Sequence, residues 1–279
     1  MRQTRKVEVN GTELHYIERG EGEPVLFVHG GMSDLRTWGP QMEPFGEYYR
    51  AISYSRRAYY PNPFPADYTT SDMMTHVEDL YGFIQALDLG QVRIVANSYG
   101  AYISLWLAIK YPRVVRAMAL AEPPVQPLLM KLPGGAEMLE EFRERAWRPA
   151  GRAFASGDME GGVRAFIEGA VGWDEYEKLP PRVRAAMMPN APEMKVGTET
   201  SFEEHMPDLT CEDASRITAP TLLMRGANSP RMYTLINNEL ARCMPYVEQV
   251  IVPNASHILH NHNPAVHNKF VLEWFELVC

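Results

Sequence analysis

The chain is poor in cysteine, and the three cysteines that it has show no pairing pattern. Cys211, Cys243 and Cys279 are scattered through the last third of the 279 residues, without a CxxC motif. This spacing predicts neither a disulfide framework nor a structural zinc site. None of the three lies at a helix-opening turn of the kind that lowers the pKa of a thiol, so cysteine catalysis is not expected.

A basic excess and long apolar runs are also missing. The formal net charge is −8 and the sequence pI is about 5.5, which leaves no surplus of Lys and Arg for a nucleic-acid backbone. Residues 1–6 are basic, but no apolar signal-peptide core follows them, and no segment approaches the roughly 18 apolar residues of a membrane span. We therefore expect a cytoplasmic protein with neither a nucleic acid nor a membrane as partner.

The chain does have enough apolar sequence for a large core. Hydrophobic residues make up 46% of it, which suits one large α/β domain or such a domain with an insertion. Residues 6–11 and 12–18 alternate apolar and polar positions around an Asn-Gly pair, the pattern of an antiparallel hairpin. Short apolar runs separated by helix-like runs follow, at 24–28, 49–54, 91–95, 117–121, 221–226 and 247–252. This order predicts a mostly parallel sheet covered by helices on both faces.

A serine between a strand-like run and a helix-like run is the most informative motif. Ser98 follows residues 91–95 and precedes the buried-helix pattern of 101–109, and Ala96 and Gly100 are small enough for a tight turn between the two. The string Ala-x-Ser-x-Gly is one substitution away from the Gly-x-Ser-x-Gly of a nucleophile elbow. An ordinary strand-to-helix turn has the same appearance, so the motif alone does not decide between them.

The pattern changes after Glu122. Between 123 and 215, prolines and glycines cluster, charged helical pieces occur and no convincing buried strand is found. We interpret 123–215 as a helical cap, or lid, inserted into a core domain that consists of 1–122 and 216–279. The long amphipathic run at 71–89 predicts a helix of that core, with Ser71 or Asp72 as its N-cap.

Five segments at the ends of predicted strands together resemble the α/β-hydrolase fold superfamily. In chain order they are 28–31 (Val-His-Gly-Gly), 96–100 (Ala-Asn-Ser-Tyr-Gly), 121–124 (Ala-Glu-Pro-Pro), 225–230 (Arg-Gly-Ala-Asn-Ser-Pro) and 254–257 (Asn-Ala-Ser-His). The resemblance implies an α/β fold with a mostly parallel, doubly wound sheet, an N-terminal antiparallel hairpin and an inserted helical cap. It also implies a serine esterase or lactonase that uses neither a cofactor nor a metal.

The resemblance assigns His257 as the catalytic base, because the family carries that residue in the loop after the last strand. A serine hydroxyl needs such a base at neutral pH, and the base needs a third group to hold its tautomer. His29 resembles the family's structural histidine beside the oxyanion loop. We interpret His260, His262 and His267 as loop or packing residues, and His15, His76 and His205 have no motif around them.

The third member of the triad departs from the common pattern. Most of the family has an aspartate after the seventh strand, where this chain has Asn228. An amide carries no charge to stabilise an imidazolium, and such a replacement costs about ten-thousand-fold in turnover. Glu122 follows the apolar run 117–121, at the same edge of the sheet. This arrangement resembles that of certain lactone hydrolases of the family, which carry their triad acid after the sixth strand. We therefore expect Glu122 to be the triad acid, with a structural salt bridge as its alternative role and Asp208 and Asp213 as weaker candidates.

Two backbone N–H groups are expected to bind the oxyanion, each contributing about 3 kcal/mol. Tyr99, directly after the nucleophile, supplies one of them. Gly31 in the His-Gly-Gly turn supplies the other, with Met32 as the neighbour that could replace it.

The cap carries aromatic and methionine side chains that suit a flexible apolar pocket, although at helical spacing such residues more often form the cap's own core. They are Met130, Met138, Trp147, Phe154, Phe166, Trp173, Tyr176, Met187, Met188 and Met194. Arg36 and Trp38 are candidates for the pocket entrance, and so is Asp34, which could equally be a helix cap.

The sequence therefore predicts a serine hydrolase that cleaves a small apolar carboxylic ester or lactone through an acyl-enzyme. A non-catalytic or weakly catalytic small-molecule binding protein of this fold is the alternative, and carbon–carbon bond hydrolases and cofactor-free haloperoxidases of the fold stay open. Haloalkane dehalogenases and epoxide hydrolases use an aspartate nucleophile, which Ser98 argues against. The oligomeric state is left open, with a homodimer as one option.

Overall fold

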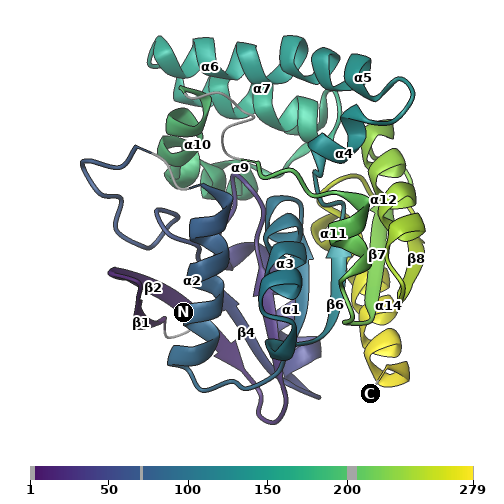
Figure 1. Cartoon of the computed structure of the whole chain (residues 1–279). Helices are drawn as coiled ribbons and strands as arrows, with labels where there is room; N and C mark the ends of the chain where they lie inside the picture. Colours follow the sequence, from purple (N-terminus) through teal and green to yellow (C-terminus); the bar gives the residue numbers. More distant parts are fainter. Residues whose placement is uncertain (1–3, 70–71, 200–205, 279) are drawn as a thin grey trace.

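The computed structural model describes residues 4–69, 72–199 and 206–278 of the chain. An eight-stranded sheet crosses it in the order β1-β2-β4-β3-β5-β6-β7-β8 (Figure 1). The strands are β1 (Arg5–Val9), β2 (Thr12–Arg19), β3 (Pro24–Val28), β4 (Arg50–Tyr54), β5 (Val92–Asn97), β6 (Val115–Ala121), β7 (Thr221–Gly226) and β8 (Val247–Val252). The β1–β2 and β2–β4 pairs are antiparallel and all the others are parallel. The predicted mostly parallel sheet with an N-terminal hairpin is therefore confirmed.

Helices occupy most of the remaining described chain. Outside the segment between β6 and β7 they are η1 (Leu35–Trp38), α1 (Gly39–Gly46), α2 (Met73–Ala86), α3 (Tyr99–Lys110), η2 (Pro112–Val114), α12 (Arg231–Cys243), α13 (Leu259–His262) and α14 (Pro264–Leu277). Between β6 and β7 lie α4 (Gln126–Met130), α5 (Gly135–Phe142), η3 (Arg143–Trp147), α6 (Arg148–Ala155), α7 (Met159–Val171), α8 (Glu175–Lys178), α9 (Pro181–Met187), η4 (Met188–Asn190), α10 (Ala191–Thr198) and α11 (Cys211–Ser215).

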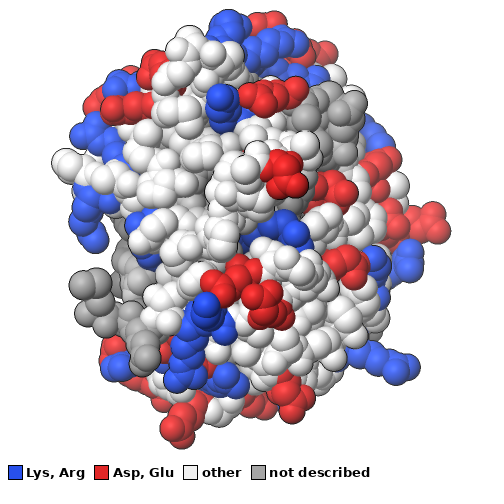
Figure 2. Space-filling view, turned by 90° about the vertical axis from the view of Figure 1, so that its left-hand side faces the viewer, with Lys and Arg blue, Asp and Glu red and all other residues white. Residues whose placement is uncertain are grey.

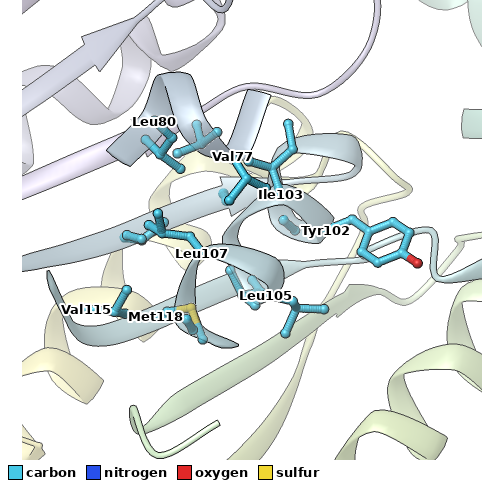
Figure 3. Close-up of a cluster of buried hydrophobic side chains, with 14 of the residues drawn as sticks. Val77, Leu80, Tyr102, Ile103, Leu105, Leu107, Val115 and Met118 are labelled. Carbon is cyan, nitrogen blue, oxygen red and sulfur yellow. The ribbon is translucent and has the colours of Figure 1, made fainter. Parts of the chain in front are cut away.

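Apolar side chains cover the sheet on both faces because alternate residues of each central strand point to opposite sides. In β5, Ile94 and Ala96 belong to the buried cluster that includes residues of α2, α3 and α12, whereas Val95 belongs to the cluster that includes residues of α1 and α14. Figure 3 shows part of the first layer, where side chains of α2 and α3 meet those of β6. Each central strand is therefore fixed in register, and its carboxyl end has a fixed place at the edge of the sheet.

The turn of the hairpin and the N-cap of α2 lie where the sequence predicts them. Asn10 and Gly11 have φ angles of 48° and 74°, which is the backbone that a two-residue hairpin turn requires. The Asp72 side chain accepts from the N–H of Thr75 at 2.7 Å and so caps α2. Of the two predicted N-cap candidates, Ser71 lies outside the described residues.

The helices between β6 and β7 divide into two groups by the residues that they bury. Leu128, Leu129 and Leu139, from α4 and α5, belong to the same buried cluster as α2 and α3. Side chains from α6 to α10 form a separate cluster, which Met32 of the loop after β3 joins. Figure 1 shows α5, α6 and α7 lying across one end of the sheet. We call α6 to α10 the cap helices; the domain boundaries at 122/123 and 215/216 stay a prediction.

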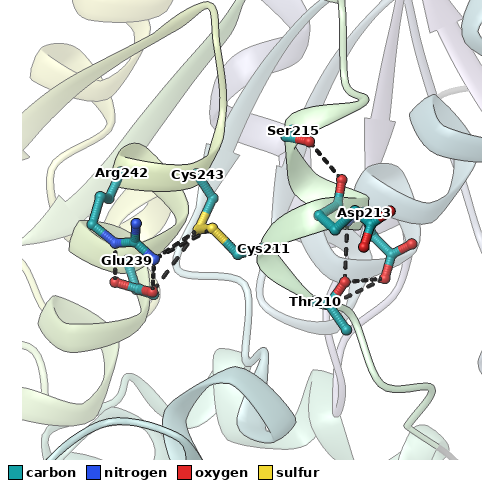
Figure 4. Close-up of a disulfide and its surroundings, with 8 residues drawn as sticks. Thr210, Cys211, Asp213, Ser215, Glu239, Arg242 and Cys243 are labelled. Carbon is teal, nitrogen blue, oxygen red and sulfur yellow. Dashed lines mark hydrogen bonds and ion pairs between the residues drawn. A yellow bond between two sulfur atoms is a disulfide. The ribbon is translucent and has the colours of Figure 1, made fainter.

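A disulfide joins Cys211 and Cys243, which have a sequence separation of 32 (Figure 4). The expectation of no disulfide is therefore wrong for this pair. The pairing depends on α11 packing against α12, and the spacing of cysteines in the sequence does not reveal such a contact. A disulfide persists in oxidising compartments and is usually reduced in the cytosol, so the cytoplasmic location stays a prediction. Cys279 lies outside the described residues.

The surface shows no gathering of basic charge on the face drawn in Figure 2, where the Lys and Arg side chains of the described residues are interspersed with Asp and Glu. A phosphate backbone requires a continuous basic surface, and this face offers none. Within the described ranges, no helix combines the length and the apolar character needed to cross a membrane.

Candidate active site

Ser98 is the residue at which β5 turns into α3. Its backbone has φ 53° and ψ −127°, a conformation that is strained for any residue with a Cβ. The N–H of Ser98 donates to the carbonyl of Ala121 at 2.8 Å, and its carbonyl accepts from the N–H of Ala101 at 2.8 Å. The strained turn is therefore held by the neighbouring strand on one side and by the new helix on the other, as in a nucleophile elbow.

Two glycines let the turn at Ser98 pack tightly against the loop after β3. A Cβ on Gly100 would come within 2.5 Å of the carbonyl oxygens of Val28 and His29. A Cβ on Gly30 would come within 3.0 Å of the Cβ of Ser98. Glycine at both positions removes the side chain that would separate the two loops, so Ser98 lies directly beside the His-Gly-Gly turn.

Glu122 and His257 form a buried hydrogen bond. Glu122 is fully buried directly after β6, and its Oε2 lies 2.7 Å from Nδ1 of His257. The other carboxylate oxygen, Oε1, accepts from the backbone N–H of Gly226 at 2.8 Å. Because a carboxylate can only accept, Nδ1 of His257 donates in this bond, and in the neutral imidazole Nε2 is then the acceptor. Gly226 at the end of β7 and His257 in the loop after β8 thus bind both carboxylate oxygens of Glu122. These bonds offset the free-energy cost of burying the carboxylate.

Two further contacts hold His257, one to its ring and one to its backbone. Tyr233 of α12 stacks on it, with ring centroids 4.1 Å apart and an interplanar angle of 14°. The side-chain amide of Asn97 donates to the backbone carbonyl of His257 at 2.9 Å. Since Asn97 directly precedes Ser98, this bond ties the loop of His257 to the turn of Ser98, and both side chains line one cavity.

His29 fixes the loop beside Ser98. Its Nδ1 donates to the carbonyl of Gly30 at 2.8 Å, and its Nε2 accepts from the backbone N–H of Arg56 at 2.9 Å. The Arg56 guanidinium, itself buried, donates to the carbonyl of Gly30 at 3.0 Å. Burial, aided by the charge of Arg56, lowers the pKa of His29 well below its usual range. A neutral His29 with both nitrogens occupied acts in positioning, as expected from the sequence.

The two predicted oxyanion donors, Tyr99 and Gly31, both lie near Ser98. Tyr99 is the first residue of α3, and a first-turn N–H has no partner within its own helix. Gly31 lines the cavities beside Ser98. Met32, the neighbour considered as its replacement, has a φ of 55° and a side chain buried among the cap helices.

Two cavities meet at Ser98. The larger, of about 530 Å³, lies between the loop after β3, the loop of His257 and the helices α7 and α9. The smaller, of about 110 Å³, lies between α3, α12 and the helices η3, α7 and α10. Four residues line both: Gly31, Ser98, Phe166 and Ala170. Such a paired cavity suits a ligand whose reacting atom is at Ser98 and whose two ends extend in different directions.

The alternative acids lie elsewhere. Asn228 is exposed, and its backbone N–H donates to the carbonyl of Ala255. It lines a third cavity and neither of the two at Ser98. Asp208 pairs with Lys131, and Asp213 caps the first turn of α11. Of the carboxylates considered from the sequence, Glu122 is the one that the structure brings to His257.

The remaining histidines that the structure describes pack or brace loops. His260 is buried, stacks on Trp38 and lies 3.1 Å from the Thr37 hydroxyl. Nδ1 of His262 accepts from the backbone N–H of Ser256 at 3.1 Å, and His267 is fully buried. The expectation that Trp38 lines the entrance is wrong, because its side chain is completely buried under α13 and α14. His205 lies outside the described residues.

The entrance and cap candidates separate into several roles. Asp34 caps η1 and also lines the larger cavity beside Arg36. Of the aromatic and methionine candidates between 123 and 215, those that line the two cavities at Ser98 are Trp147, Phe166, Met187 and Met194. Phe154 and Tyr176 are buried in the cluster of the cap helices, whereas Met130 and Trp173 are exposed.

Several lining residues carry no signal in the sequence. They are Thr37, Tyr59, Gln126, Phe142, Arg182, Glu193, Met206, Met232, Tyr233 and Asn261. Each lies on a helix or loop whose orientation toward Ser98 is set by packing, which no local pattern encodes.

One cluster of possible metal ligands is found among the described residues, formed by Cys211, Glu239 and Cys243. Both sulfurs are used in the disulfide, and a disulfide sulfur is not the thiolate that a metal binds. Arg242 pairs with Glu239 beside it (Figure 4).

Comparisons with known proteins agree with this fold. The sequence model of the alpha/beta hydrolase family matches residues 25–268. The (E)-2-((N-methylformamido)methylene)succinate hydrolase of Acinetobacter baylyi is 24% identical over 96% of this chain and 95% of its own length. The structure of an N-acyl homoserine lactone degrading enzyme superposes with a TM-score of 0.76 at 22% identity, covering 96% of this chain and 99% of that one. The enol-lactonase of Burkholderia xenovorans superposes with a TM-score of 0.75 at 19% identity, over 98% and 100%. Because the family model spans most of the sequence, this chain belongs to the alpha/beta hydrolase family.

Proposed function

We propose that this hydrolase cleaves a carboxylic ester or lactone through an acyl-enzyme formed on Ser98. The observation that carries the proposal is the buried hydrogen bond from His257 to Glu122, at the wall of the cavity that holds Ser98. It leaves Nε2 of a neutral His257 as the acceptor that a serine nucleophile needs.

The reaction follows from this arrangement. His257 takes the proton of the Ser98 hydroxyl as its oxygen attacks the carbonyl carbon, and the charge of Glu122 stabilises the imidazolium that forms. The N–H groups of Tyr99 and Gly31 bind the oxyanion of the tetrahedral intermediate, at about 3 kcal/mol each. His257 then gives its proton to the departing alkoxide. Water repeats the sequence on the acyl-enzyme, with His257 as its base, and releases the acid.

The relatives support a hydrolytic reaction without naming its substrate. Two of the similar structures act on lactones, and the curated relative acts on a substituted succinate. At these identities the structural likeness shows the fold alone, so the ester or lactone rests on the site itself. Carbon–carbon bond hydrolysis uses the same serine elbow and is the second reaction that the screen below includes.

The test is a hydrolysis screen with wild-type protein and Ser98→Ala. The panel holds aryl esters of short and long acids, simple and macrocyclic lactones, and a dienoic ketone as carbon–carbon substrate. We expect turnover of at least one ester or lactone by the wild type and none by Ser98→Ala. Turnover of the ketone alone would replace the proposal by carbon–carbon hydrolysis, and no turnover at all, with intact folding, would favour a binding protein.

A further inference from the structure

Two cavities meet at Ser98, and they differ in their access to His257. The larger cavity includes Ser98 and His257 in its wall. Of the described residues that line the smaller cavity, none is His257; Tyr233, which stacks on the His257 ring, lies there instead. The acid that protonates the leaving group is therefore reachable from one cavity only.

The direction of proton transfer then fixes the orientation of the substrate. His257 must deliver its proton to the leaving oxygen within hydrogen-bond reach. We infer that the leaving group occupies the larger cavity and the acyl chain the smaller one, and that the substrate joins a short apolar acid to a polar, anionic alcohol. This inference rests on the proposed serine mechanism and adds to it the class of substrate.

The smaller cavity suits a short apolar acyl chain. Its wall includes the side chains of Phe142, Trp147, Met194, Met206 and Met232. At about 110 Å³, it is smaller than the apolar cavity of about 150 Å³ that accommodates benzene in an engineered protein. An acyl chain of about four carbons fits such a volume, and a chain of eight does not.

The polar groups of the smaller cavity do not change this conclusion. The hydroxyl of Tyr59 donates to the carboxylate of Glu193, so these two groups are bonded to each other. The wall also includes Tyr99, Tyr233 and Gln126, and Oε1 of Gln126 is buried without a hydrogen-bond partner among the described residues. An apolar acyl chain leaves the Tyr59–Glu193 bond intact.

The larger cavity carries a surplus positive charge. Three charged side chains line it within the described chain: Asp34, Arg36 and Arg182. Arg36 donates to both carboxylate oxygens of Asp34, at 2.8 and 2.6 Å, so these charges cancel. Arg182 has no hydrogen-bond or ion-pair partner among the described residues. His260, also in the wall, is neutral because burial lowers its pKa well below the usual range.

The charge of Arg182 thus gives this cavity its preference for an anion. An exposed guanidinium attracts a carboxylate and pairs with it in a bidentate manner. A lactone fits the same scheme when its ring lies across Ser98, with the ring oxygen toward His257 and any negatively charged substituent toward Arg182.

The test combines two substrate series with variants that each touch one cavity. One series varies the acyl chain from acetyl to octanoyl on a constant alcohol. The other keeps a butyryl group and compares esters of 3-hydroxybenzoate and 3-hydroxybenzamide, which differ in charge and little in size. Trp147→Ala alters the smaller cavity, and Arg182→Gln alters the larger one. Gly197→Val provides a second variant of the smaller cavity, because a Cβ there meets nothing within 4 Å.

For the smaller cavity, we expect Trp147→Ala to raise the ratio of kcat/KM for hexanoyl esters to kcat/KM for acetyl esters about tenfold. This is the scale of discrimination that a few methylenes produce in an apolar pocket. Gly197→Val is expected to shift the preference the other way. Neither variant should change the carboxylate-to-carboxamide ratio. For the larger cavity, Arg182→Gln should lower that ratio about fivefold, the scale of an exposed ion pair, and should leave the acyl preference unchanged.

Deacylation separates the two ends directly, because the leaving group has gone when it occurs. Arg182→Gln should leave the deacylation rate of a given acyl-enzyme unchanged, whereas Trp147→Ala should change it. The inference is overturned if Arg182→Gln alters acyl preference or deacylation, or if the Trp147 and Gly197 variants alter the carboxylate-to-carboxamide ratio. Failure of the wild type to hydrolyse any ester, or activity retained by Ser98→Ala, would refute the proposed function and this inference with it.

Discussion

Nδ1 of His257 lies 2.7 Å from Oε2 of Glu122, and the second oxygen of that carboxylate accepts from the N–H of Gly226. The carboxylate comes from the end of β6, whereas the residue after β7 in the position most common for the acid is an exposed Asn228. A Cβ on Gly226 would come within 2.4 Å of the carbonyl of Ala255. The end of β7 therefore contributes a backbone donor and close packing to the pair, and no acid.

Glu122→Gln is expected to lower kcat at least about a hundredfold. The amide can still accept a hydrogen bond from Nδ1, but it carries no charge to stabilise the imidazolium. Asn228→Ala is the matched control and should change kcat little, because its side chain lies outside both cavities at Ser98. Steady-state kinetics on one ester substrate measures both variants, and a larger loss for Asn228→Ala would refute the assignment.

Tyr233 is expected to position the base through its ring. A stacked aromatic pair contributes about 0.5–1.5 kcal/mol, so Tyr233→Leu should lower kcat about two- to tenfold. Tyr233→Phe keeps the ring and should retain most of the wild-type kcat. Equal losses in the two variants would show that the hydroxyl, and not the stacking, matters.

The disulfide is expected to stabilise the fold. It closes a loop over a sequence separation of 32 residues, and such a cross-link contributes about 2–4 kcal/mol to the free energy of unfolding. Complete reduction should therefore lower the Tm measured by circular dichroism. The double variant Cys211→Ser, Cys243→Ser should have the lower Tm with or without reductant. An unchanged Tm of the wild type, with reduction verified by thiol titration, would contradict this.

The free energy of unfolding is expected to fall as the pH drops below about 6.5. Burial lowers the pKa of His29, His76 and His260 well below the usual value of 6.5, and that of His267 to about 4. The unfolded chain therefore binds more protons than the folded one below pH 6.5. The free energy of unfolding has its full value above that pH. As the pH falls toward the pKa values of the folded state, it decreases by up to about 1.4 kcal/mol per pH unit for each histidine.

Urea unfolding at pH 7.5 and pH 5.5 measures this dependence. We expect a decrease of at least about 2 kcal/mol at the lower pH, and a shallower dependence in His267→Gln. Equal unfolding free energies at the two pH values would show that these histidines are not held neutral.

Local patterns in the sequence predict the elements of the site better than its surroundings. Ser98 is predictable because the flanking strand and helix are long apolar runs, and Glu122 because a carboxylate after a buried strand needs a partner. The Cys211–Cys243 disulfide is not predictable in this way, since it depends on α11 meeting α12 in space.

The cap helices show the same limit. Phe154 and Phe166 have equal claims as pocket residues in the sequence, yet one is buried among the cap helices and the other lines both cavities. Helical spacing predicts that a side chain is buried, but the partner against which it packs is decided by tertiary contacts. Arg182 and Tyr233 carry no signal in the sequence for the same reason, because their neighbours in space are distant along the chain.

The most direct test of the account is covalent labelling with a fluorophosphonate, located by mass spectrometry of the digested protein. We predict one adduct, on the peptide that contains Ser98, which is lost in Ser98→Ala and forms much more slowly in Glu122→Gln. A folded wild-type protein that takes no label, or takes it on a residue other than Ser98, would contradict the claim that Ser98 is an activated nucleophile.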